Sequence, residues 1–138
     1  MFLTLGIAWG WIVLLILILG YIGFLIYQYF KVKKILTNLS EKEFKKGYRK
    51  AQLIDIREQK DYDAGYILGA RNIPMSQLKR RINELRKDLP VYLYDQNGTR
   101  SPRAAIILHK EGFEKLYYLE DGFKQWTGNI KKTKKPNY

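Results

Sequence analysis

The stretch "PVYLYDQNGTRSPRAAIIL", Pro90 to Leu108, decides the fold, because it predicts a strand, a loop and a helix in direct succession. The run "VYLY" is β-branched and aromatic with no breaker inside it, which is typical of a buried strand. Ser101 suits the N-cap of a helix and Pro102 its first position. The loop between them, residues 95–100, therefore joins the carboxyl end of a strand to the amino end of a helix. Unpaired N–H groups and the helix dipole favour an anion there, and Asp95 places a negative charge at that point.

Strands and helices alternate on both sides of this stretch. "AQLIDIR" and "KLYYLE" are predicted strands and "ARNIP" a minor one, while short helices are expected after Ser40, which forms a capping box with Glu43, and within "EQKDYDAGY". "MSQLKRRINELRKD" predicts an amphipathic helix, and "FKQWTGNI" predicts a final helix. The stripe of the amphipathic helix would hold Leu78, Ile82, Leu85 and Leu89. The alternation predicts an α/β fold, a small parallel sheet with helices on both faces.

Residues 1–30 contain no Asp, Glu, Lys, Arg or His. As a helix they would span about 45 Å, against a hydrocarbon core of about 30 Å. A cleaved signal peptide fits less well, because the basic n-region and the small-residue cleavage site are missing. We therefore expect one N-terminal transmembrane helix that remains as an anchor. Gly6 and Gly10 form a GxxxG pattern, which is a hint of a weak homodimer through this helix.

The net charge of +12 is concentrated at the edges of the remaining chain. Residues 31–50 hold eight basic and two acidic residues, and "KKTKK" at 131–135 holds four lysines, so residues 51–130 carry only +2. A nucleic-acid-binding protein would carry its basic charge on the folded surface, so we expect no nucleic-acid partner. Basic residues that flank a transmembrane span instead determine the topology of the protein and attract anionic lipids. The excess of basic residues directly after the span predicts a single-pass membrane protein, with its amino terminus outside and its soluble domain in the cytoplasm.

These boundaries divide the chain into four parts: a transmembrane helix at 1–30, a basic juxtamembrane linker at 31–39, a folded domain at 40–130 and a basic tail at 131–138, expected to be disordered. The chain has no cysteine and a single histidine, His109. Disulfides, thiolate metal sites and sulfur nucleophiles are thereby excluded. We expect no cofactor and no metal site.

Three ordered motifs resemble the rhodanese-like domain family. They are "LIDIREQKDYDAGYILGARNIP" at residues 53–74, "VYLYDQNGTRSPRAAIIL" and the closing "LYYLEDGFKQW" at 116–126. The second resembles the family's active-site strand, loop and helix, so the resemblance assigns the loop to Asp95, Gln96, Asn97, Gly98, Thr99, Arg100 and Ser101. It also implies that Asp55 and Arg57 are structural.

Two positions depart from the family pattern. Asp95 stands where active sulfurtransferases of the family carry the catalytic cysteine, and Tyr66 replaces the usual histidine of the first motif. A carboxylate cannot form the persulfide through which these enzymes transfer sulfur, and related phosphatases need the same cysteine. The resemblance therefore implies a pseudoenzyme, sulfurtransferase-like in fold, with no catalytic residue of the family's kind.

The leading hypothesis is a membrane-anchored, catalytically inactive rhodanese-like domain that acts as an interaction or sensing module on the cytoplasmic membrane face. Its expected partners are the lipid bilayer and a protein. Within it, Asp95 is either a built-in ligand of the loop or simply an acceptor that keeps the loop folded, and Arg100 is expected to pair with Asp95 or a nearby carboxylate. One alternative is an enzyme of another type using Asp95, with a metal shared by Asp55. Another is a module that binds anionic ligands or lipids through "KVKK" at 31–34, Lys45 and Lys46, and "KKTKK" at 131–135.

Overall fold

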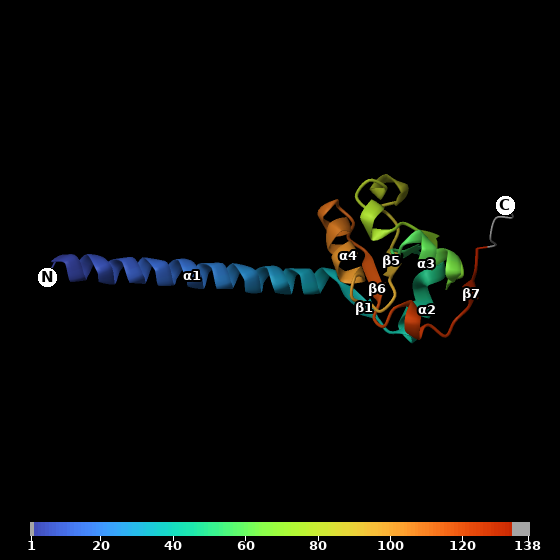
Figure 1. The fold of residues 1–138 in the computed structure, drawn as a ribbon, viewed down its shortest axis with the longest axis horizontal. Coiled ribbons are helices and arrows are strands. Elements are labelled where there is room, and N and C mark those ends of the chain that lie inside the picture. Colours follow the sequence, from blue (N-terminus) through green and yellow to red (C-terminus); the bar gives the residue numbers. More distant parts are fainter. Residues whose placement is uncertain (1, 134–138) are drawn as a thin grey trace. The chain divides into compact units, whose positions relative to one another are not determined.

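The computed structural model describes residues 2–133 and consists of two compact units, one ending at Lys34 and the other beginning at Ile35. The first unit is the helix α1, Phe2–Ile35 (Figure 1). Residues Phe2–Lys31 make it the one helix among the described residues that is long and apolar enough to cross a membrane. Because no charged residue precedes Lys31, the exposed surface of this part of the helix is almost entirely apolar.

The second unit is built on a five-stranded parallel sheet in the order β1-β6-β5-β2-β4. The strands are β1 Thr37–Leu39, β2 Gln52–Asp55, β4 Arg71–Asn72, β5 Val91–Tyr94 and β6 Leu116–Leu119. A separate antiparallel pair joins β3, Tyr66–Ile67, to β7, Ile130–Lys131. The predicted α/β class with a parallel sheet is confirmed.

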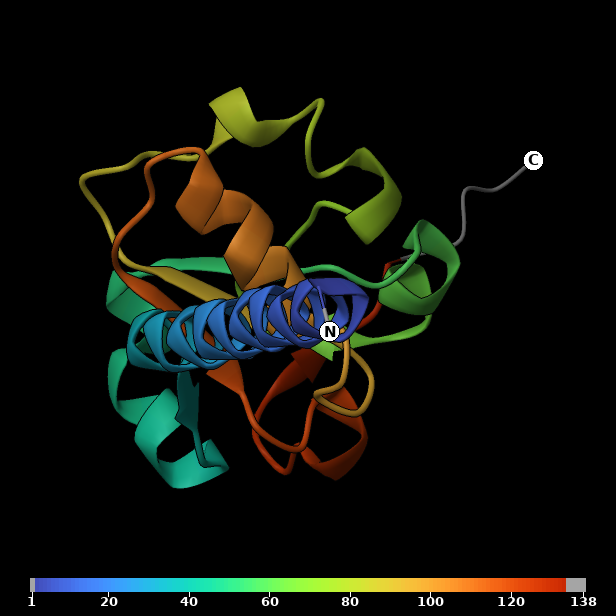
Figure 2. The same cartoon turned by 90° about the vertical axis from the view of Figure 1, so that its left-hand side faces the viewer.

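Side-chain alternation along β5 separates two cores, one on each face of the sheet. Val91 and Leu93 belong to the first core, which packs under α4, Ser101–Lys110. Tyr94 belongs to the second, with Phe44 of α2, Glu41–Gly47. The remaining cover of this second face comes from η1 (Tyr48–Lys50), α3 (Gln59–Ala64) and η4 (Phe123–Gln125). Figures 1 and 2 show α4 and α2 on opposite sides of the sheet, as predicted.

The segment predicted as an amphipathic helix at 75–88 is not a continuous helix. It forms two 3-10 turns, η2 (Met75–Gln77) and η3 (Ile82–Glu84). The side chain of Gln52 holds Arg86 by donating to its carbonyl and accepting from its N–H, both at 2.7 Å, which favours an extended end for the segment. Leu78 and Leu85 are still buried and Ile82 packs against the same core, whereas Leu89 is not part of it. The apolar stripe therefore predicted the packing of three of its four residues and predicted the backbone wrongly.

The predicted final helix is only the single turn η4. Trp126 turns to extended backbone because its ring packs against Phe44 and Tyr48. The next N–H, that of Thr127, donates to the carboxylate of Glu41 at 2.5 Å. These contacts with α2 outweigh the local preference for helix.

The segment predicted as a linker at 31–39 forms a helix and a strand instead. The helix α1 runs to Ile35, and residues 37–39 form β1, an edge strand that pairs with β6. The predicted tail at 131–138 begins within β7, and the expectation of disorder for 134–138 lies outside the described residues.

Candidate functional site

The loop 95–100 leaves the carboxyl end of β5 and enters α4, as predicted. The residue at the N-cap position is Arg100, with no capping side chain, and Ser101 is the first residue of the helix. The prediction of Ser101 as N-cap was therefore wrong by one position. Its hydroxyl is completely buried and donates to Asp95 Oδ1 at 2.7 Å, so it serves the loop carboxylate instead of the helix backbone.

Asp95 is 2% exposed, and both of its carboxylate oxygens accept hydrogen bonds from the loop. Oδ1 accepts from the N–H of Gly98 at 2.9 Å as well as from Ser101, and Oδ2 accepts from the N–H of Arg100 at 2.8 Å. N–H groups that converge at a helix start form an anion cradle. The side chain of Asp95 fills this cradle from within.

The shape of the loop depends on a glycine. Gly98 has a φ of +86°, and a Cβ added there would lie 1.9 Å from the carbonyl oxygen of Glu120. The segment after β6 also holds the loop, because the N–H groups of Phe123 and Lys124 donate to the carbonyls of Asp95 and Gln96 at 2.8 and 2.9 Å. The cradle is thus fixed from both sides, by α4 and by the segment that follows β6.

A buried ion pair lies beside the cradle, at the carboxyl end of the neighbouring strand β2. Arg57 donates from Nη2 to Asp55 Oδ2 at 2.7 Å and from Nε to both carboxylate oxygens at 3.1 Å. Its remaining donors reach the carbonyl of Gly65 at 2.6 Å and the amide oxygen of Gln96 at 3.0 Å. The guanidinium lies 4.2 Å from the ring centroid of Phe123. The structural role implied for Asp55 and Arg57 agrees with these contacts.

Two pKa shifts follow from this packing. Burial opposes the charge on Arg57, but the hydrogen bonds and attraction of Asp55 outweigh it and raise the pKa of Arg57. Burial, together with the nearby Asp55 carboxylate, raises the pKa of Tyr94 well above its ordinary value. The Tyr94 hydroxyl therefore stays neutral and accepts from the N–H of Ile67 at 3.1 Å. Neither group is set up to exchange protons near neutral pH.

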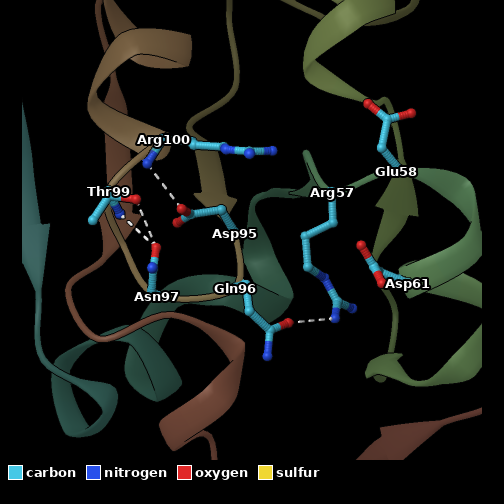
Figure 3. A pocket seen from close by; sticks show the side chains of 8 residues that line it. All are labelled: Arg57, Glu58, Asp61, Asp95, Gln96, Asn97, Thr99 and Arg100. Carbon is cyan, nitrogen blue, oxygen red and sulfur yellow. Dashed lines mark hydrogen bonds between the residues drawn. The ribbon is translucent and has the colours of Figure 1, made fainter.

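A pocket of about 270 Å³ opens above the loop and the ion pair (Figure 3). Its lining is polar and comes from the ends of two neighbouring strands: Arg57, Glu58, Asp61, Asp95, Gln96, Asn97, Thr99 and Arg100. In Figure 3 the side chain of Arg100 extends across the pocket. Within residues 2–133 this side chain has no hydrogen bond or ion pair, and only its backbone N–H reaches Asp95. The expected pairing of the Arg100 guanidinium with a carboxylate is therefore wrong for this conformation.

The structure brings the predicted loop residues together, with different placements. Asp95, Gln96, Asn97, Thr99 and Arg100 line the pocket, whereas Gly98 and Ser101 lie beneath it as donors to Asp95. The sequence reasoning missed three lining residues, Arg57, Glu58 and Asp61. They directly follow β2, and the rule that ligands bind at the carboxyl ends of adjacent parallel strands could have identified them.

The alternative of a metal shared by Asp95 and Asp55 gains no support. The hydrogen bonds described above occupy both carboxylates. Within the described range 2–133 no group of three or more His, Asp or Glu side chains is placed to hold a metal ion.

Fold and site together define a small α/β protein whose strand-loop-helix anion site already contains its own carboxylate. The family model of the rhodanese-like domain matches residues 40–129, and the chain belongs to this family.

Three curated proteins are similar to the chain. It is 52% identical to "Uncharacterized protein YqhL" of Bacillus subtilis (strain 168) over 122 residues, 88% of this chain and 97% of YqhL. It is 34% identical to "Putative sulfur carrier protein YrkF" of the same organism, over 55% of this chain and 41% of YrkF. It is 36% identical to "Thiosulfate sulfurtransferase GlpE" of Pseudomonas fluorescens, over 55% of this chain and 70% of GlpE. The protein is thus related to the sulfur carrier and sulfurtransferase families.

Solved structures show the same fold. A rhodanese-like domain protein of Staphylococcus aureus superposes with a TM-score of 0.65 at 22% identity, covering 71% of this chain and 99% of that one. A thiosulfate sulfurtransferase of Pseudomonas aeruginosa superposes with a TM-score of 0.63 at 26% identity, covering 70% of this chain and 20% of that one.

Proposed function

We propose that this protein is a membrane-anchored rhodanese-like domain, inactive in sulfur transfer, that works as an interaction or sensing module at the cytoplasmic membrane face. One observation carries the proposal: the carboxylate of Asp95 is bound by the donors of the loop, Gly98, Arg100 and Ser101. A site whose N–H groups already hold an internal anion has no cradle left for an anionic sulfur donor.

Sulfur transfer from thiosulfate needs a thiolate that attacks the outer sulfur of thiosulfate, forms a persulfide and releases sulfite. The chain has no cysteine, so no group in it can form that bond. This composition supports the proposed inactivity, and the loop keeps its donors Gly98, Arg100 and Ser101.

The other enzymatic alternative would use Asp95 as a nucleophile or base. A nucleophile needs a free lone pair directed at a substrate, and a base needs access to the proton that it removes. Asp95 is almost fully buried, and its two oxygens share three hydrogen bonds with the loop. This geometry favours a structural anion over a reactive carboxylate.

The proposed orientation follows from the charge around the span. Residues 1–30 are uncharged and Lys31, Lys33 and Lys34 follow directly, so the positive-inside bias places the soluble domain in the cytoplasm. Protease added to intact protoplasts should leave the domain intact and digest it after lysis. Digestion before lysis would mean that the domain lies outside the cell. That result would not bear on the proposed inactivity in sulfur transfer.

An assay of thiosulfate:cyanide sulfurtransferase activity tests the inactive-domain proposal. The wild-type chain should form no thiocyanate above the uncatalysed rate, while Asp95→Cys should gain a measurable rate, because the change supplies the missing nucleophile inside the cradle. Turnover by the wild type would overturn the proposal.

The pocket is the proposed place of interaction with a protein partner. Arg100 is the cation there that forms no ion pair within residues 2–133, so it offers a contact to an incoming acidic group, beside the carboxylates of Glu58 and Asp61 in the same lining. Affinity capture with the intact protein should recover a partner that Arg100→Ala and a deletion of residues 40–130 both lose. Capture unaffected by Arg100→Ala would mean that the partner binds outside the pocket.

A further inference from the structure

The helical segment formed by α2 and η1 has two chemically different sides. Phe44 and Tyr48 are buried in the second core. The opposite side carries exposed basic residues at spacings of four, three and one along the segment, which places them together. We call this set the basic face; its members are Lys42, Lys46, Arg49 and Lys50.

The charges of the basic face are not neutralised within the domain. None of its four side chains forms an ion pair in the described part of the chain, and Arg49 contacts only the ring and hydroxyl of Tyr48. Lys45, on the flank, is different: its Nζ lies 3.3 Å from Glu41 and 3.4 Å from the hydroxyl of Thr127. Glu43 is the acidic residue on the exposed part of this helix, so the surface keeps a net positive charge.

An apolar pocket of about 260 Å³ adjoins the basic face and shares Arg49 with it. Its walls are formed by Tyr48, Ala51, Leu53, Leu68 and Gly69. Leu68 is 43% exposed, although it is a large apolar side chain in a folded domain. Basic residues next to an exposed leucine and a partly apolar hollow make an amphipathic surface, which is the chemistry of a membrane interface.

The position of this surface in the chain suggests what it meets. The uncharged segment ends at Phe30, and the first residue of the basic face is Lys42. If the chain is anchored as proposed above, so short a connection keeps the basic face at a high effective concentration near lipid headgroups. Weak electrostatic attraction then suffices for docking.

We propose that the basic face and the Leu68 pocket dock the domain onto an anionic membrane surface. The four cations contact headgroup phosphates, and the side chain of Leu68 enters the interfacial layer. This inference rests on the anchoring in the proposed function and adds a fixed orientation of the domain to it.

Docking in this way leaves the Asp95 loop exposed to the cytoplasm. Lys50 lies just before β2, at the amino ends of the parallel strands, whereas the loop follows the carboxyl end of β5. Lys50 and the loop thus lie at opposite ends of the strands, and Leu68, which precedes β4, lies at the same end as Lys50. Lys42 follows β1 at the carboxyl ends, so the basic face extends from one end of the strands to the other. The pocket that contains Arg100 therefore remains open to a partner while Leu68 is in contact with lipid.

The test uses single thiols in the full-length chain, which has no cysteine of its own. Leu68→Cys and, as a control at the opposite end of the strands, Thr99→Cys are labelled with a polarity-sensitive fluorophore. Each protein is reconstituted in phosphatidylcholine vesicles, with or without phosphatidylglycerol, and quenching by a nitroxide on the lipid chains is measured.

We expect quenching of the label at position 68 in anionic vesicles, loss of that quenching at high salt and in neutral vesicles, and no quenching at position 99. Each basic side chain removed should lower the ratio of docked to undocked domain about fivefold. Replacing all four residues of the basic face by Gln should therefore abolish quenching. An equal change in net charge on the opposite face should preserve it; the control replaces Lys79, Arg80, Arg103 and Lys110 by Gln.

The results separate this inference from the proposed anchoring. Carbonate extraction reports the anchor, and a chain that it releases from membranes would contradict the proposed function. A retained chain whose label at position 68 stays unquenched in anionic vesicles would overturn the docking inference alone. Equal quenching in neutral and anionic vesicles would also overturn it, because the surface would not be recognising charge.

Discussion

The hydroxyl of Ser101 donates a hydrogen bond of 2.7 Å to Oδ1 of Asp95, and both side chains are buried. The first residue of α4 thus donates to the first residue of the loop, six positions earlier in the chain. This bond, with those from the N–H groups of Gly98 and Arg100, makes Asp95 part of the framework of the loop.

Asp95→Ala should destabilise the domain by about 2–4 kcal/mol, because two partly buried N–H groups and one buried hydroxyl would lose their acceptor. Urea unfolding of the full chain in detergent, followed by near-ultraviolet circular dichroism, measures the change. Asn97→Ala is the matched control in the same loop, since Asn97 is exposed and accepts only from Thr99. A loss no larger for Asp95→Ala than for Asn97→Ala would mean that the cradle does not depend on its internal anion.

The ion pair of Asp55 and Arg57 should show strong coupling. Arg57→Met should cost about 3–5 kcal/mol, because it leaves the completely buried carboxylate of Asp55 without its cation. Adding Asp55→Asn to that variant should recover part of the loss, since the stranded charge is then removed. Denaturation of the two single variants and the double variant gives the coupling free energy. Strict additivity would contradict the pairing.

Alanine substitutions at Gly98 and Gly69 distinguish the cost of backbone strain from the cost of a steric collision. Both have a positive φ, +86° and +93°, but a Cβ at Gly98 would collide with the Glu120 carbonyl, whereas one at Gly69 meets nothing within 4 Å. Gly69→Ala should therefore cost about 1 kcal/mol, the strain of the left-handed region alone. Gly98→Ala should cost clearly more and should also displace the loop. Equal costs would show that the packing of the loop against the segment after β6 is unimportant.

Glu41 gives a prediction for pH. Burial raises the pKa of its carboxyl, but hydrogen bonds from the hydroxyl and N–H of Thr127, together with Lys45, outweigh burial and leave the pKa lowered. A lowered pKa in the folded state contributes stability above the unfolded pKa, and this contribution is lost as pH falls through the folded pKa. Glu41→Gln should cost about 1 kcal/mol at pH 7 and almost nothing well below pH 4.

Glu43→Gln is the control for that pH dependence. Glu43 lies in the same first turn, but its carboxylate has no hydrogen bond or ion pair among residues 2–133. Its replacement should cost at most about 0.5 kcal/mol, the helix-dipole contribution. A cost for Glu41→Gln that does not change between pH 7 and pH 3 would contradict the described contact with Thr127.

Much of this architecture is predictable from local patterns. The β-branched and aromatic run from Val91 to Tyr94, which has no breaker inside it, predicted a buried strand. The capping box predicted that Ser40 accepts from the N–H of Glu43, found at 3.3 Å. Resemblance to the family located the loop. These features depend on neighbours in the sequence, which is why sequence reasoning identified them.

The errors come from contacts between distant parts of the chain. Gln52 holds Arg86 and the segment at 75–88 becomes two short turns; Glu41 holds Thr127 and the final helix stops after one turn. The position of Ser101 inside the helix follows from its bond to Asp95. No helical period or capping rule includes such partners, so local reasoning predicted regular helices in these places.

The most direct test of the central claim is the pKa of the thiol introduced by Asp95→Cys, followed by the ultraviolet absorbance of the thiolate. If the N–H groups of Gly98 and Arg100 form an anion cradle that Asp95 now fills, the thiol should ionise at about pH 5–7, well below the ordinary value of about 8.5. Thr99→Cys, at the exposed tip of the same loop, should give the ordinary value. A thiol at position 95 that ionises at or above about 8.5 in a folded domain would contradict the account, because it would mean that the loop does not stabilise an anion.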